Sequence, residues 1–123
     1  MLKKSTTTTK ARPKQSIEST SENLTKATSE GDGFYSCGWT WPAIHWFNYS
    51  DVLKVFNSIK VSRIKGLLIT NTGIFGFNGH GNELDISEYD KAYESRLEII
   101  ADSETALQHA AELIESLQAV DET

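Results

Sequence analysis

The sequence predicts one α+β domain with two layers, in which a sheet carries two helices on one face. The sheet is expected to be antiparallel or mixed, to have four to five strands, and to follow a disordered tail. Three observations lead to this prediction: a polar first quarter, several segments that alternate polar and apolar residues, and two segments with helical spacing. The chain has 123 residues, which suits a single domain.

The first 33 residues differ in composition from the rest of the chain. They hold six basic and four acidic residues, twelve Ser or Thr, and few large apolar side chains. Such a segment buries too little apolar surface to offset its backbone entropy. We therefore predict a disordered polar tail or linker over 1–32 and a folded domain over 33–120. A basic, hydroxyl-rich tail could instead dock on an acidic partner or be phosphorylated.

The folded part begins with an aromatic strand and a short helix. Residues 34–41 are rich in aromatic side chains, which favour strands, and Pro42 ends the strand or places it at an edge. Ser50 is the expected N-cap of a helix of about ten residues, and Asp51 suits the positive end of its dipole. Its apolar residues are Val52, Leu53, Val55, Phe56 and Ile59.

Four further segments have the pattern of strands. Residues 61–70 and 74–78 form a hairpin around a turn at 71–73, and 83–87 and 95–101 alternate with period two. Residues 79–82 are expected to form a second turn. We expect the pair 64–70 and 74–78 at the centre of the sheet, with Leu68 in the core and Leu67 on the other face.

The last element is an amphipathic helix. Asp102 or Ser103 is the expected N-cap, and Glu104 falls in the first turn. The apolar positions recur at helical spacing and form one stripe, which comprises Leu107, Ala110, Ala111, Ile114 and Leu117.

Several protein classes are excluded by what the sequence lacks. It has neither a membrane-length apolar run nor a leader-like start, so we expect a soluble, cytoplasmic protein. A single Cys37 excludes an internal disulfide. It has no P-loop motif and no catalytic constellation, so we expect no enzyme activity and no cofactor. We expect no nucleic-acid and no membrane partner.

The metal-ligating residues are few and scattered. Cys37, His45 and His80 are weak candidates, because a zinc site usually takes four ligands at short, paired spacings. We expect no metal site built from this chain. The alternative is a small metal-binding or metal-buffering protein that uses these three residues.

Two groups of residues are candidates for partner or anion binding. Arg63, Lys65 and Arg96 lie in predicted strands, and Arg63 and Lys65 share a face by period two. The structural alternative is an ordinary cross-strand pair with Glu98. Trp39 and Trp41 are aromatic candidates of the kind that dominates interfaces, and their alternative is a place in the core.

Several motifs in order resemble the C-terminal domain of the CobW family. The resemblance covers about residues 33–120 and is carried most specifically by the Arg-x-Lys-Gly strand and the Ser-Arg-Leu-Glu-Ile-Ile strand. The matching segments are Gly33 to Trp39, Phe47 with Leu53, Arg63 to Leu68, Gly73 to Asn78, and Ser95 to Ile100.

The resemblance implies an accessory domain without the catalytic part. CobW-like proteins are GTP-hydrolysing metal chaperones or cobalamin-biosynthesis factors, and their nucleotide site and Cys-x-Cys-Cys motif lie in a P-loop domain that has no counterpart here. It implies a non-catalytic module that binds a P-loop GTPase domain or a metalloprotein client. Zinc or cobalt would then be handled only through that partner. The chain would be a split or excised half, or a stand-alone relative that acts on its partner in trans.

Overall fold

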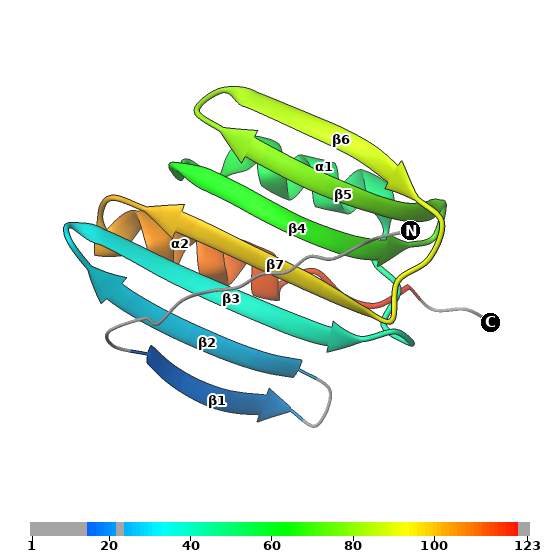
Figure 1. Ribbon diagram of the computed structural model, residues 1–123, viewed down its shortest axis with the longest axis horizontal. Coiled ribbons are helices and arrows are strands. Elements are labelled where there is room, and N and C mark those ends of the chain that lie inside the picture. The colour runs from blue at the N-terminus through cyan, green and yellow to red at the C-terminus, as the bar shows by residue number, and fades with distance from the viewer. Residues whose placement is uncertain (1–14, 22–23, 121–123) are drawn as a thin grey trace.

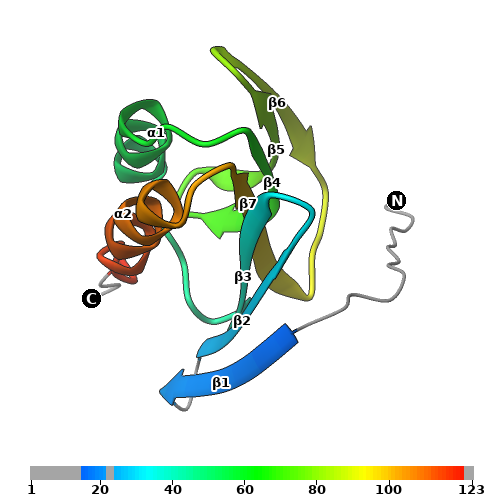
Figure 2. The same cartoon turned by 90° about the vertical axis from the view of Figure 1, so that its left-hand side faces the viewer.

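The protein folds into one seven-stranded sheet with two helices packed on one face (Figures 1 and 2). The computed structural model describes residues 15–21 and 24–120. All paired strands are antiparallel, in the order β1-β2-β3-β7-β4-β5-β6. The elements are β1 (Gln15–Ser21), β2 (Leu24–Gly31), β3 (Phe34–Pro42), α1 (Tyr49–Ser58), β4 (Arg63–Thr70), β5 (Gly73–His80), β6 (Glu83–Tyr89), β7 (Glu94–Ala101) and α2 (Glu104–Glu115).

The α+β class and the element order from β3 onward confirm the prediction, but the sheet has more strands than the four to five expected. The extra strands, β1 and β2, lie in the region assigned to the tail. Residues 25–31 pair with β3 from Thr25 opposite Thr40 to Gly31 opposite Phe34. Their composition is poor in apolar residues, so pairing with β3 supplies the stabilisation that the local sequence lacks. The rest of the predicted tail, 1–14 and 22–23, lies outside the described residues.

The centre of the sheet is β7 rather than the β4–β5 hairpin, which corrects the prediction. Cys37 of β3 and Ile64 of β4 both pair with Ile99 of β7, so the last strand of the chain is inserted between two earlier ones. The β4–β5 hairpin itself forms as expected, around a turn at Asn71 and Thr72. The next turn is shorter than predicted, because 79 and 80 belong to β5.

The hydrophobic core lies between the sheet and the two helices. Leu68 is fully buried on the helix-facing side, whereas Leu67 is half-buried on the other face, as the alternation predicts. Gly66 permits close packing here, since a Cβ at this position would lie 2.7 Å from the backbone oxygen of Arg96. Other buried side chains of this layer are Trp39, Val52, Phe56, Ile64, Phe77, Leu97, Ile99, Leu107, Ala110 and Ile114.

Both helices begin at capping side chains. The Oγ of Ser103 accepts a hydrogen bond of 3.1 Å from the Ala106 N–H at the start of α2, which confirms one of the two predicted caps. In α1 the cap is Asn48 rather than Ser50, and its Oδ1 accepts from the Asp51 N–H at 3.0 Å. Asn48 serves because the helix begins at Tyr49, one residue before the predicted cap. The residues of the predicted stripe are all buried, although the last of them, Leu117, lies beyond the end of α2.

Candidate functional site

The sheet face opposite the helices is covered by no helix of the described residues (Figure 2). Period two places Arg63, Lys65 and Leu67 of β4 on this open face. The register sets Lys65 opposite Glu98 and Leu67 opposite Arg96 of β7. The three predicted basic residues therefore lie on two neighbouring strands of one face. Lys65 is a diagonal neighbour of Arg96, whereas Arg63 lies opposite Ile100, four residues along β7 from Arg96.

The charges of the open face are mixed rather than uniformly basic. Arg96 lies 3.5 Å from Glu94 (Nε to Oε2), with both side chains largely exposed, and Glu98 stands opposite Lys65. Such exposed pairs contribute about 0–1 kcal/mol to stability. Arg63 differs, because its register neighbours are Ile100 and His80. This surface can recognise a partner with a complementary pattern of both signs.

One end of the open face is apolar, which the sequence reasoning did not identify. Ile69 is paired with Ile74, and Ile74 is paired with Tyr89. The Tyr89 ring lies over Gly76, where an added Cβ would approach its Cε1 to 2.6 Å, yet the residue is 40% exposed. The sequence does carry a signal for this apolar end, because period two places these residues on the face opposite the core-facing residues. An apolar patch next to charged residues is a usual composition for a protein-binding surface.

Trp39 and Trp41 belong to the core, which is the alternative that the sequence left open beside partner binding. They are 2% and 4% exposed, and their rings stack with centroids 6.3 Å apart. The Trp39 indole N–H donates to Glu115 Oε2 at 2.9 Å, and the Trp41 ring meets Phe47 edge-on. Alternation puts both tryptophans on the helix-facing side with Cys37, where the core needs large side chains.

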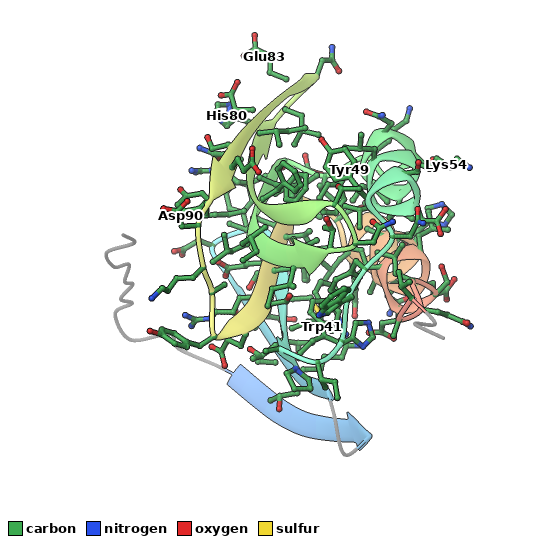
Figure 3. The ribbon with its side chains drawn as sticks, turned by 90° about the vertical axis from the view of Figure 1, so that its right-hand side faces the viewer. Trp41, Tyr49, Lys54, His80, Glu83 and Asp90 are labelled. Atoms are coloured by element: carbon green, nitrogen blue, oxygen red, sulfur yellow. The ribbon has the colours of Figure 1, made fainter. Side chains whose placement is uncertain are left out.

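The three metal candidates do not come together. Cys37 is buried on the helix-facing side of β3, whereas His80 is an exposed residue of the open face at the end of β5. The intervening strands β7 and β4 separate these positions by about 14 Å, at the usual spacing between strands. In Figure 3 His80 also lies far from Trp41, beside which His45 packs. Within the described ranges, 15–21 and 24–120, no group of three or more His, Cys, Asp or Glu residues is placed to hold a metal.

His45 has a distinctive environment between β3 and α1. Its ring lies against Trp41 and Phe47, with centroids 6.0 and 4.6 Å away, and its buried Nε2 makes no hydrogen bond. Desolvation by burial lowers the pKa of His45 below its usual 6.5. The ring therefore acts as a neutral packing group at neutral pH.

Comparison with known proteins shows a similarity to a zinc chaperone. The chain is 33% identical over 89 residues to the zinc chaperone YeiR of Escherichia coli (strain K12), a stretch that covers 69% of this chain and 27% of that protein. No family model and no solved structure matches the chain. Neither helix in the described part of the chain is long and apolar enough to span a membrane. The chain thus spans about a quarter of its curated relative, and this similarity supports a relationship with CobW-like metallochaperones.

Proposed function

We propose that this chain is a non-catalytic accessory domain that serves zinc trafficking by binding a partner protein. The observation that carries the proposal is the similarity to a zinc chaperone over about a quarter of that protein's length. We take this quarter to be the C-terminal accessory domain of the CobW-like arrangement, in which the nucleotide and metal sites lie in another domain. The partner is then a P-loop GTPase domain or a metalloprotein client, and zinc, or cobalt, is handled through it.

The open face is the surface we assign to this partner. It offers three basic residues, Arg63, Lys65 and Arg96, and the apolar end around Tyr89 on one sheet. A sheet held by six strand pairings changes shape little on binding, which limits the entropy cost of association. The charges would select the partner and orient it, while the apolar end would supply most of the affinity.

The test is a titration with one identified partner. The purified chain is added to the P-loop GTPase domain of a CobW-like zinc chaperone from the same organism, and heat is measured with and without GTP and Zn²⁺. We expect a saturable one-to-one complex. The variant Arg63→Ala with Lys65→Ala should weaken it by about tenfold or more, which is about 1.4 kcal/mol.

Lys54→Ala is the matched control, because Lys54 is an exposed cation of α1 on the helix side of the molecule (Figure 3). It should leave the dissociation constant within about twofold, and thermal unfolding should show that all variants remain folded. The absence of binding, or equal weakening by Lys54→Ala, would contradict the proposed role of the open face.

A further inference from the structure

A groove runs along the flank of α2, on the face of the sheet that carries the two helices (Figure 2). It has a volume of about 570 Å³ and is bounded by α2 on one side and by β2 on the other. α2 packs on β3 and β7, and the sheet continues past it through β2 and β1 (Figure 2). The residues that line it are Lys26, Thr28, Ser29, Glu30, Tyr35, Cys37, Glu104, Leu107, Gln108 and Ala111.

The floor of the groove is small and apolar. Cys37, Leu107 and Ala111 are 1%, 8% and 9% exposed, so the apolar surface that they offer to the groove is narrow. Glu104, Gln108 and Ala111 follow one another along α2 at spacings of four and three residues, which places them on one flank of that helix. Ala111 has no side chain beyond Cβ, so a neighbouring backbone can approach α2 closely at this point.

The two ends of the groove differ in charge. At one end Lys26 Nζ lies 2.7 Å from Glu115 Oε2, and the same oxygen accepts from the Trp39 indole. At the other end are Glu30 and Glu104, both exposed. They share this end because Glu30 pairs with Tyr35, which pairs with Ala101 just before α2. The groove is therefore acidic at the end where α2 begins.

We propose that this groove binds an amphipathic helix of a partner protein, with a narrow Ala/Leu stripe against the floor and Lys or Arg against Glu30 and Glu104. The inference goes beyond the proposed function, because it assigns a second surface on the opposite face. α1 and α2 already lie side by side on this face, and the next position for a helix is over β2 and β1 (Figure 1). Helices pack on sheets and on helices at about 10 Å, so one helix fits against β2 and α2 together.

Charge complementarity specifies the partner. Lys26 is already paired with Glu115, so the negative charge offered to a partner comes from Glu30 and Glu104. A basic helix gains from this negative charge, and an acidic helix of the same apolar pattern is repelled.

The experiment uses the full chain and a defined probe. A fluorescein-labelled, capped peptide of Ala, Leu, Gln and Lys, with one Leu/Ala stripe and Lys on both flanks, is titrated by anisotropy; its twin carries Glu in place of Lys. We expect saturable binding of the Lys peptide below about 1 mM and at least about tenfold weaker binding of the Glu peptide. Amide chemical shifts should move along α2 and β2.

Two variants and one control locate the contact. The double variant Glu30→Lys with Glu104→Lys should weaken binding of the Lys peptide by about tenfold and strengthen binding of the Glu peptide. The control Glu88→Lys makes one such charge change on β6, away from the groove, and should alter the binding of neither peptide. Absence of saturable binding, equal binding of both peptides, or insensitivity to the double variant would overturn the proposal. Tighter binding of a peptide with the sequence of residues 1–14, which has five basic and no acidic residues, would reassign the groove to the chain's own N-terminal segment. The Arg63 and Lys65 variants test the open face separately, so a failure of the proposed function can be distinguished from a failure of the groove proposal.

Discussion

Leu67 and Leu68 are adjacent residues on opposite faces of β4, and their truncation should have very different costs. Leu68 is fully buried between the sheet and the helices, so Leu68→Ala removes contacts on every side and leaves a cavity. Such changes cost about 2–5 kcal/mol, and complete burial favours the upper half of this range. Leu67 is half-buried on the open face, so Leu67→Ala should cost about 1 kcal/mol, because water can fill the space.

The assay is urea unfolding followed by fluorescence of the two buried tryptophans, Trp39 and Trp41. With a slope of about 1.5 kcal/mol/M, a loss of about 3.5 kcal/mol lowers the midpoint by about 2.3 M, and a loss of about 1 kcal/mol lowers it by about 0.7 M. The slope should stay constant in both variants. Equal and large midpoint shifts would mean that both faces of β4 are internal, and the open face would have to be abandoned as a binding surface.

Three further changes test single contacts. Glu115→Ala should lower the free energy of unfolding by about 1–3 kcal/mol, because it leaves the Trp39 indole and the Lys26 ammonium without this acceptor; a double-mutant cycle with Trp39→Phe measures the coupling. Because the pKa of His45 is lowered in the folded chain, the unfolded chain binds a proton at higher pH, and the free energy of unfolding should fall as the pH drops below about 6.5. Urea midpoints measured at pH 7.5 and 5.5 should therefore differ less for His45→Phe than for the natural chain. Gly66→Ala should lower the melting temperature clearly, because its Cβ would meet the Arg96 backbone at 2.7 Å; an unchanged melting temperature would refute this packing.

The helices and the hairpin could be predicted from local patterns alone. The stripe of α2 and its Ser103 cap are local signals, and the alternation of Leu67 and Leu68 gave the correct faces. The sequence leaves Trp39 and Trp41 open between an interface and the core, although they share a period-two face with Cys37 that indicates the core. In this case the abundance of tryptophan outweighed its periodicity.

The remaining features depend on contacts between distant segments. β2 has little apolar surface of its own, and its stability comes from pairing with β3 and from the Lys26–Glu115 contact with α2. The register that brings Lys65 opposite Glu98 likewise depends on where β7 inserts, which no local pattern encodes. The groove beside α2 was missed for the same reason, because its walls come from three separate elements.

The insertion of β7 between β3 and β4 also sets an order of events during synthesis. Until residue 101 has left the ribosome, β3 and the β4–β5–β6 meander each have an unpaired edge, and the meander has only α1 to cover its apolar side. Unpaired edges and uncovered apolar faces are what nascent chains aggregate through. Joining the two parts requires contacts distant in sequence, such as Cys37 with Ile99, so we expect slow formation of the complete sheet. A chain that stops before β7 would therefore be a substrate for chaperones rather than a smaller version of the domain.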